Sequence, residues 1–520
     1  MSVAGDERLY PGAIGERDPD RPAVAMGATG EVMTYAELDT YANRLARLLR
    51  ARGLERGDQI ALCVENRLEF LPLIWGCHYA GLYYTPISTR LTGDEIAYIV
   101  DDCGAKAYIG STYKATESVE SAAVTPKVMH RFAVGGPVPG HEDLDALLRD
   151  QPSAPLADRR EAVEMLYSSG TTGRPKGVKP PLPDAPLGEP GRFVHMARRV
   201  FGVTDGSRYL SPAPLYHAAP LRFCMAALRV GATVVVMERF DAEQMLSMIE
   251  RHRISTTQLV PTMFVRMLKL PDDVRARYDV SSLTHATHAA APCPVEVKHR
   301  MLDWWGPIIH EFYAGTEGAG ICYISPTDWL ERPGSVGQAI GATIHVVDEN
   351  GAELPPGEEG QIYSDSSSDF EYHNDPAKTA ETRHPAGWRT LGDIGRVDAD
   401  GFLFLTDRKA FTINSGGVNV YPQEAENALV LHPAVADVAV FGVPNEDFGE
   451  EVKAVVQLET PVDSAAELAA LEVELISHCR SQLADIKCPR SIDFRSELPR
   501  EPTGKLLKKK LRDEYWPARA

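Results

Sequence analysis

The segment from Tyr167 to Val178, which reads YSSGTTGRPKGV, constrains this chain more than any other stretch. Its glycines and small hydroxyl residues let several backbone N–H groups turn toward one point. Together with a terminal lysine, this composition predicts a loop that holds phosphate groups. The loop is not a Walker A sequence, because Arg174 and Pro175 stand where that pattern requires Gly-Lys. We assign phosphate binding to Ser168, Ser169, Gly170, Thr171, Thr172, Gly173 and Lys176.

The length and charge of the chain narrow the classes of protein that fit. A chain of 520 residues is too long for one hydrophobic core and predicts two or more domains. The net charge of −19 argues against nucleic acid or an anionic membrane as the main partner. The eight cysteines are scattered, which predicts reduced thiols. Without an apolar leader or a run of membrane-spanning length, we expect a cytoplasmic protein with no integral membrane segment.

The first 160 residues alternate between helical and strand patterns. Thr34 and Glu37 have the spacing of a capping box, and apolar residues follow at helical intervals until Gly53. This alternation predicts a wound α/β subdomain. The expected elements that follow Gly53 are a strand at 59–64, a helix at 68–79 and a strand at 83–86. Further along the chain, Asp241 is expected to start a helix that runs through residue 252.

Three other segments lack a regular pattern. Residues 135–160 are rich in proline and charge and are expected to form a loop. The Pro-rich residues 180–191 either cover the site or form a plain surface connection. The third segment, 288–294, reads HAAAPCP and places small residues at a strand end, where wound α/β folds bind ligands. Ala290 therefore either leaves room for a flat nucleotide group or packs tightly against its neighbours.

A second site is predicted at residues 311–318, which read EFYAGTEG. Tyr313 offers a ring on which adenine can stack, and Thr316 offers a hydroxyl for a phosphate. Glu317 is a hard oxygen ligand suited to Mg²⁺, which would bridge phosphate oxygens. We assign Glu311 and Phe312 to the same nucleotide site.

Two charged residues near position 400 have the chemistry of a ribose site. Asp393 is expected to lie in a Gly-Asp-Ile turn, and its carboxylate can accept two hydroxyl hydrogen bonds, as a ribose diol requires. Arg408 has a forked guanidinium that suits ribose or phosphate oxygens. A local ion pair between aspartate and arginine is the structural alternative, and both interpretations are compatible.

Taken in order, these segments resemble the signatures of the adenylate-forming superfamily, which includes acyl-CoA synthetases, luciferases and the adenylation domains of peptide synthetases. The string EFYAGTEG departs from the usual second signature at Ala314, where glycine is commoner. The resemblance implies an α/β fold with a large N-terminal domain of wound α/β subdomains and a β-barrel-like subdomain. It implies domain limits of 1–407 for this AMP-binding domain and 408–520 for a small α+β lid domain.

The resemblance also implies roles for residues that the sequence alone leaves open. His217, in SPAPLYHAAPLRF, matches a position beside the acyl group, and its alternative is a structural histidine. Gly416 and Gly417 match a close approach to the pantetheine arm of CoA. Lys505, in PREPTGKLLKKKLR, matches the catalytic lysine, and Thr171 joins Glu317 as a metal ligand. Lysines 508–510 are expected to be a solvated helix face, and the alternative is that they hold CoA phosphates.

The implied activity is that of an ATP-dependent acyl-CoA ligase that uses ATP, Mg²⁺ and coenzyme A. An amino-acid substrate is disfavoured, because no acidic residue between Asp205 and Glu238 could pair with an amine. We therefore expect an apolar carboxylic acid, of the fatty or the steroid and bile-acid type, as the small-molecule partner, and a homodimer is compatible with these features. The alternatives are a ligase that loads a carrier protein, a luciferase-like oxidative enzyme, and a non-catalytic nucleotide-binding relative.

Overall fold

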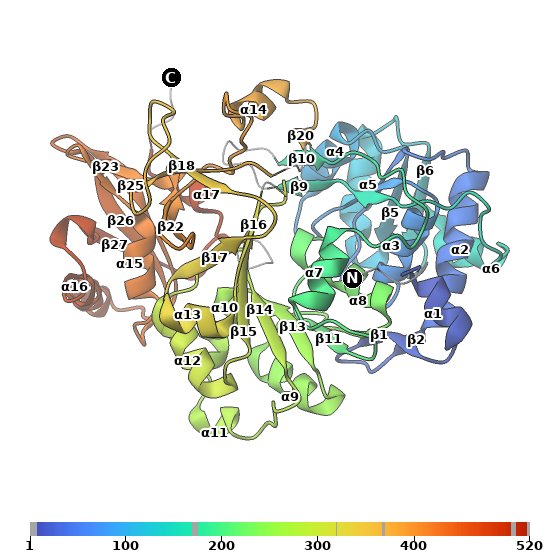
Figure 1. The fold of residues 1–520 in the computed structure, drawn as a ribbon, viewed down its shortest axis with the longest axis horizontal. Coiled ribbons are helices and arrows are strands. Elements are labelled where there is room, and N and C mark those ends of the chain that lie inside the picture. Colours follow the sequence, from blue (N-terminus) through green and yellow to red (C-terminus); the bar gives the residue numbers. More distant parts are fainter. Residues whose placement is uncertain (1–7, 169–174, 319, 367–369, 501–505, 517–520) are drawn as a thin grey trace.

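The computed structural model describes residues 8–168, 175–318, 320–366, 370–500 and 506–516. It has a larger amino-terminal part built on two main sheets and a smaller carboxyl-terminal part (Figure 1). In Figure 1 the smaller part, coloured orange to red, lies beside the yellow strands of the larger part, and the blue strands lie on the opposite side. This arrangement confirms the predicted α/β fold with a large and a small domain. Within these residues, no helix is both long and apolar enough to cross a membrane.

Six parallel strands form the first sheet. Helices pack around this sheet, and two of them, α2 (Tyr35–Ala51) and α3 (Phe70–Tyr79), correspond to the predicted ones. α2 begins at the predicted capping box, where Thr34 Oγ1 accepts from the Glu37 backbone N–H at 3.2 Å and Glu37 accepts from the Thr34 N–H at 2.8 Å. The order of the strands is β7 (Glu142–Asp143), β6 (His130–Val134), β5 (Ala107–Ser111), β3 (Gln59–Leu62), β4 (Tyr83–Pro86) and β8 (Val163–Glu164).

Thirteen strands form the second sheet, which changes from parallel to antiparallel pairing at β15 (Ile309–Ala314). These antiparallel strands continue the second sheet in the part of the chain for which the resemblance implies a β-barrel-like subdomain. The parallel strands are β1 (Pro22–Met26), β12 (Thr233–Val236), β11 (Arg208–Ser211), β13 (Thr256–Leu259), β14 (His285–His288) and β15, with β2 (Val32–Thr34) antiparallel at the edge. The antiparallel strands that follow β15 are β16 (Ile321–Ile324), β17 (Ser335–Ala339), β22 (Leu403–Arg408), β21 (Asp393–Val397), β19 (Gly360–Ser364) and β18 (Ile344–Val347).

Helices connect the parallel strands of the second sheet and bury its faces. The predicted helix after Asp241 is α9 (Ala242–His252), and the Asp241 carboxylate accepts from the Gln244 N–H at 2.8 Å. The other helices of this region are α7 (Arg192–Arg199), α8 (Ala218–Val230), α10 (Pro261–Leu268), α12 (Val295–Trp305) and α13 (Pro326–Glu331).

The carboxyl-terminal part is a five-stranded sheet with helices packed against it. Its strands are β23 (Ile413–Ser415), β24 (Val418–Val420), β25 (Val435–Asn445), β26 (Gly449–Leu458) and β27 (Ser491–Arg495). Its helices are α15 (Pro422–Leu429), α16 (Ala465–Arg480) and α17 (Lys508–Asp513). The limit that we predict between residues 407 and 408 falls inside β22, one strand before this sheet begins.

Two expected loops have different outcomes. Residues 135–160 are not a simple loop, because they contain β7 and the helix α6 (Leu144–Arg149). Asp143 starts this helix by accepting from the Ala146 N–H at 3.0 Å. The Pro-rich residues 180–191 pack on the first sheet, where the Pro180 carbonyl accepts from the Tyr83 hydroxyl at 2.9 Å. None of these described residues lines the cleft that holds the predicted site, so the segment is a surface connection.

A buried cluster of Arg229, Glu161 and His78 joins α8 to the first sheet. Arg229 Nη1 donates to Glu161 at 3.0 Å, and His78 Nε2 lies 2.9 Å from the same carboxylate. Glu161 is 6 % exposed. Burial alone would raise the pKa of Glu161, but the neighbouring His78 and Arg229 outweigh it and lower the pKa to about 2. His78 is therefore a packed structural histidine.

This cluster predicts a specific acid sensitivity. The pKa of Glu161 lies below its ordinary value of 4.5, so its contribution to stability is complete above about pH 4.5 and is lost as the pH falls toward 2. We expect Glu161→Gln to be less stable than the wild type at pH 7, and the two proteins to converge as the medium is acidified. Thermal unfolding followed by circular dichroism between pH 7 and pH 3 measures this. Parallel curves for the two proteins would contradict it.

Candidate active site

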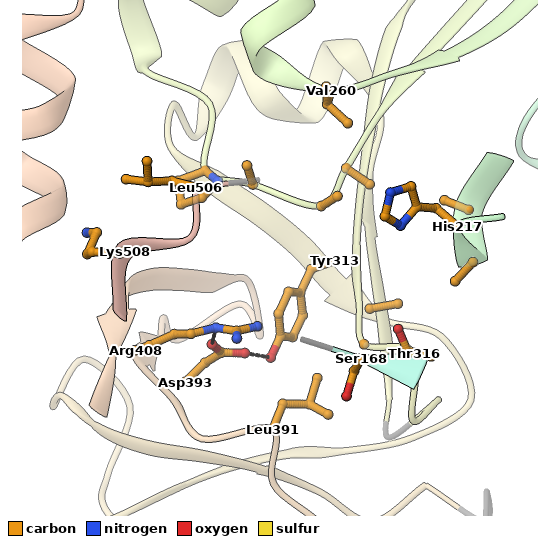
Figure 2. Close-up of a pocket in the computed structure, with 18 of the residues that line it drawn as sticks. Ser168, His217, Val260, Tyr313, Thr316, Leu391, Asp393, Arg408, Leu506 and Lys508 are labelled. Carbon is orange, nitrogen blue, oxygen red and sulfur yellow. Dashed lines mark hydrogen bonds and ion pairs between the residues drawn. The ribbon is translucent and has the colours of Figure 1, made fainter. Parts of the chain in front are cut away.

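The predicted site residues meet in one cleft between the larger and the smaller part. The cleft has a volume of about 2070 Å³ and follows the carboxyl ends of β13, β14 and β15. Figure 2 shows Tyr313 and Asp393 near its middle, with His217 on one side and Lys508 on the other. Eleven of the residues that we assigned from the sequence line it, namely Ser168, Lys176, His217, Ala290, Glu311, Phe312, Tyr313, Thr316, Glu317, Asp393 and Arg408.

The flanks of the predicted phosphate loop lie at the cleft. Residues 169–174, which include Ser169, Gly170, Thr171, Thr172 and Gly173, are outside the described residues. On either side of them, β9 (Leu166–Ser168) and β10 (Lys176–Lys179) pair antiparallel, with Ser168 opposite Lys176. The Lys176 Nζ lies 3.6 Å from Asp375 and 5.5 Å from the centre of the Tyr372 ring. A lysine and a hydroxyl therefore face the cleft at the base of this loop.

Tyr313, Asp393 and Arg408 form a hydrogen-bonded row (Figure 2). Asp393 accepts from the Tyr313 hydroxyl at 2.6 Å and from Arg408 Nε at 3.1 Å. Asp393 is not in a turn as we expected, but is the first residue of β21, directly opposite Arg408 on β22. Strand register thus brings together two residues that are 15 positions apart. The row places a carboxylate beside an aromatic ring, which suits a ribose next to a stacked base.

Thr316 and Glu317 lie on the turn after β15. The Tyr372 hydroxyl donates to Glu317 Oε1 at 2.9 Å, which orients this carboxylate in the cleft wall. A Cβ at Gly315 would lie 2.7 Å from Glu317 Oε2 and 2.8 Å from Leu391, so a larger residue here would displace these two side chains. Ala314 is the last residue of β15, so the departure from the usual signature falls on a strand and leaves the turn glycine in place.

The donor chemistry fits a magnesium ion that is shared with a nucleotide. Mg²⁺ is commonly bound through one or two carboxylates together with substrate phosphates, and Glu317 supplies such a carboxylate. Within the described part of the chain, no group of three or more His, Cys, Asp or Glu residues could hold a metal ion on its own. Thr171, the other predicted ligand, lies outside the described residues.

His217 caps the amino end of α8 at the side of the cleft opposite the small domain. Its ring lies 4.2 Å from the Tyr216 ring, measured between centroids. Apolar side chains line the cleft around it, among them Phe193, Met196, Ala219, Phe312 and Ile321. The histidine therefore stands between the nucleotide row and an apolar wall. This is the position that the resemblance implies for a residue beside an acyl group.

Glu311 lines the cleft, but its carboxylate is engaged inside the protein. Lys298 Nζ donates to Glu311 Oε2 at 2.6 Å, and His288 Nε2 lies 3.3 Å from the same oxygen. Burial alone would raise the pKa of Glu311, but His288 and Lys298 outweigh it and lower the pKa to about 2. Burial lowers the pKa of His288 itself, and of the two partners Lys298 makes the shorter contact with Glu311.

The carboxyl-terminal part presents one of its two predicted segments to the cleft. Leu506 and Lys508, which follow the predicted catalytic Lys505, line the cleft, whereas Lys505 itself is outside the described residues. Gly416 and Gly417 connect β23 to β24 and are not among the described residues that line the cleft. The structure thus brings the lysine segment, and not the glycine hairpin, toward Asp393.

The expectation for Lys508 was wrong, and Tyr372 was not predicted as a site residue. Lys508 is not part of a solvated face, because it is 6 % exposed and its Nζ lies 2.8 Å from Glu426. Tyr372, which orients Glu317, was missed. Its sequence neighbourhood carries no signal, since its partner lies 55 positions away.

Comparison with known proteins agrees with this geometry. Residues 13–370 match the family model for AMP-binding enzymes, and residues 424–505 match the model for their C-terminal domain. The long-chain-fatty-acid–CoA ligase FadD13 of Mycobacterium tuberculosis is 31% identical over 96% of both chains. A feruloyl-CoA synthase of Amycolatopsis is 33% identical over 95% of this chain and 96% of its own. The o-succinylbenzoate CoA synthetase MenE of Bacillus subtilis, solved with an acyl-adenylate, superimposes with a TM-score of 0.80 at 26% identity, covering 98% and 99% of the chains.

The two matched domains and the cleft between them define an adenylate-forming enzyme. The chain belongs to the AMP-binding enzyme family, in the acyl-CoA synthetase branch of the adenylate-forming superfamily. Its class is that of the AMP-forming acid–thiol ligases, for which ATP and CoA are substrates.

Proposed function

We propose that this enzyme couples an apolar carboxylic acid to coenzyme A through an acyl-adenylate. The observation that carries the proposal is the row of Tyr313, Asp393 and Arg408 in one cleft with Glu317 and His217. The row provides a stacking ring and a diol acceptor for the adenosine, and the apolar wall beside His217 provides room for the acyl group. Ser168 and Lys176 lie where the phosphates would be held.

In the first half-reaction, a carboxylate oxygen of the acid attacks the α-phosphorus of ATP. A new oxygen–phosphorus bond forms, the bond to the bridging oxygen of the β-phosphate breaks, and pyrophosphate leaves. Lys505 would offset the negative charge that develops at the α-phosphate, and Lys176 would hold the leaving pyrophosphate. A magnesium ion held by Glu317 and Thr171 would supply further charge stabilisation. Positioning and charge account for most of the catalysis in such transfers.

In the second half-reaction, the thiol of CoA attacks the acyl carbonyl and AMP leaves with its phosphate. The new thioester replaces the mixed anhydride, and the thiol proton is released. The hairpin at Gly416 and Gly417 would have to approach the cleft if it holds the pantetheine arm. In the described residues it is the segment at Leu506 that lines the cleft. A turn of the small domain between the two half-reactions would exchange these segments.

An apolar acid fits the described wall of the cleft. Arg222 lines the cleft beside this wall, but its Nε already donates to Glu164 at 2.6 Å. A second carboxylate on the substrate would have to compete with Glu164 for this arginine. A fatty acid or a compact ring acid of the steroid or bile-acid type fits this chemistry. Two relatives are named for a long-chain fatty acid and for ferulate, which fit this chemistry, whereas a third is named for o-succinylbenzoate, which carries a second carboxylate.

Pyrophosphate release tests the proposal. We expect release with ATP, Mg²⁺ and an apolar acid, and repeated turnover once CoA is added. The panel should run from short to long fatty acids, then to aryl and steroid acids, with an amino acid and a dicarboxylic acid as negative controls.

The other outcomes separate the alternatives. Release that CoA does not stimulate would indicate a carrier protein as the acceptor. Release with the amino acid or the dicarboxylic acid alone would contradict the apolar substrate. Binding of ATP in calorimetry without release for any acid of the panel would indicate a non-catalytic nucleotide-binding protein.

A further inference from the structure

A buried ion cluster connects the two ends of a loop that forms part of the cleft wall. His288 is the last residue of β14, and the loop of residues 289–294 leads from it into α12, which carries Lys298. His288 and Lys298 both contact the Glu311 carboxylate, at 3.3 and 2.6 Å. His288 and Glu311 are also direct neighbours in the register of β14 and β15. Glu311 thus ties together the residues before and after the loop.

The tied loop is part of the wall and holds an unusual backbone conformation. Residues 289–294 all line the cleft. Ala290 has a φ of 75°, in the left-handed region that residues other than glycine seldom adopt. Such a conformation persists where the surrounding structure imposes it. Glu311 contacts both flanks of this loop, and the Ala289 N–H also donates to the Leu259 carbonyl at 3.3 Å, so these interactions together hold the loop.

The side chains of this cluster are buried, so they do not bind a ligand directly. Lys298 is fully buried and Glu311 is 6 % exposed, and the Lys298 ammonium also lies 4.7 Å from the centre of the Trp329 ring. A buried charge that is paired in this way contributes little net stability. Removing one partner nevertheless leaves the other uncompensated. The ion pair therefore fixes the geometry of the cleft wall and contributes little to the free energy of unfolding.

We propose that Lys298, Glu311 and His288 are positioning residues for the nucleotide. They fix the loop of residues 289–294 on one side and, through the chain from Glu311 to Tyr313, the stacking ring on the other. Glu311 then acts on the nucleotide through this wall and not as a ligand. The inference rests on the proposed function, because it takes the nucleotide to lie against Ala290 and Tyr313.

The chain offers a matched control for this cluster. Arg229, Glu161 and His78 also form a buried group of one cation, one glutamate and one histidine, and Glu161 is 6 % exposed, as Glu311 is. None of these three described residues lines the cleft. Replacing either glutamate by glutamine leaves a buried cation without its partner. The control should therefore lose stability to a similar extent without altering nucleotide binding.

The test measures ATP affinity by calorimetry, with Mg²⁺ present, and thermal stability by circular dichroism. We expect Glu311→Gln to weaken ATP binding by at least about tenfold, which corresponds to roughly 1.4 kcal/mol. We expect Glu161→Gln to lower the unfolding temperature to a similar degree while the affinity stays within about twofold of the wild type. In Lys298→Met combined with Glu311→Gln no lone charge remains. Its stability should recover while ATP binding stays weak.

Several results would overturn the positioning role. Glu311→Gln with wild-type affinity would do so, and so would an equal loss of affinity in Glu161→Gln. If Glu311→Gln does not fold, the double variant decides, since wild-type affinity in it would show that the cluster is structural alone. A wild-type enzyme that does not bind ATP would overturn the proposed function and this inference together. Failure of the inference alone appears as normal ATP binding in both the wild type and the variants.

Discussion

Replacing Lys505 by alanine is expected to slow adenylation by about 10²–10³-fold, the typical loss when one preorganised donor is removed from a developing charge. The rate of the thioester step, started from a supplied acyl-adenylate and CoA, should stay within about threefold of the wild type. The charge that Lys505 would stabilise at the α-phosphate develops in the adenylation step, which this assay bypasses. The described residues that follow Lys505, Leu506 and Lys508, line the cleft that contains Asp393. A four-carbon ammonium side chain from this segment has the reach and charge for the proposed role.

Single-turnover assays of the two half-reactions provide the measurement. Pyrophosphate release reports adenylation, and loss of free thiol reports thioester formation. Lys487→Ala is the matched control, because it removes the same charge from the same domain at a residue that pairs with Glu424 and is not among the described residues lining the cleft. Equal losses in both half-reactions for Lys505→Ala would undo the assignment.

Replacing Asp393 by alanine is expected to weaken ATP binding on the order of 100-fold, because two charge-assisted contacts are lost and a nucleotide diol loses its acceptor. Asp393 is 6 % exposed. Without its carboxylate, the Tyr313 hydroxyl and the Arg408 Nε would each lose a hydrogen-bond acceptor in the cleft wall. Asp393→Asn should fall between the wild type and alanine, since an amide oxygen still accepts one hydrogen bond but carries no charge. Calorimetry with ATP and Mg²⁺ measures these affinities.

Two further variants make the result specific. Tyr313→Phe keeps the ring and removes the hydroxyl, so it should cost less than about tenfold if the ring provides stacking. Asp398→Ala alters the opposite end of the same hairpin, where Asp398 accepts from the Asp400 and Phe402 N–H groups outside the cleft lining. It should leave ATP affinity unchanged within about threefold. Similar losses in Asp393→Ala and Asp398→Ala would show that the hairpin fold matters, and not the Asp393 carboxylate.

Local signals in the sequence were enough to predict those helices and loops that are determined by residues close together in the chain. The capping box at Thr34 and Glu37 and the cap at Asp241 each act over three residues, and both helices begin where these signals place them. The phosphate loop and the string EFYAGTEG are likewise continuous. Described cleft-lining residues in both, among them Ser168, Lys176, Tyr313 and Glu317, were therefore assigned from the sequence alone.

The pairings that complete the site depended on the tertiary structure. Asp393 meets Arg408 because β21 and β22 pair in one particular register, and Tyr372 reaches Glu317 across 55 positions. The partner of a polar side chain in such cases follows from strand register and packing, which no local pattern encodes. The same reason explains why Glu311 was assigned to the nucleotide and Lys508 to a solvated face.

The sequence by itself therefore determined the family, the two-domain α/β fold and eleven of the residues that line the described cleft. Only the tertiary structure decided which of them face a ligand and which face each other. Glu311 and Glu317 illustrate the difference, since they stand six positions apart in one motif. One is held by a buried lysine from α12, and the other is oriented in the cleft wall by a tyrosine from β20 (Glu371–Tyr372). Burial and long-range contacts distinguish them, because chemically equal carboxylates differ only in what the fold brings beside them.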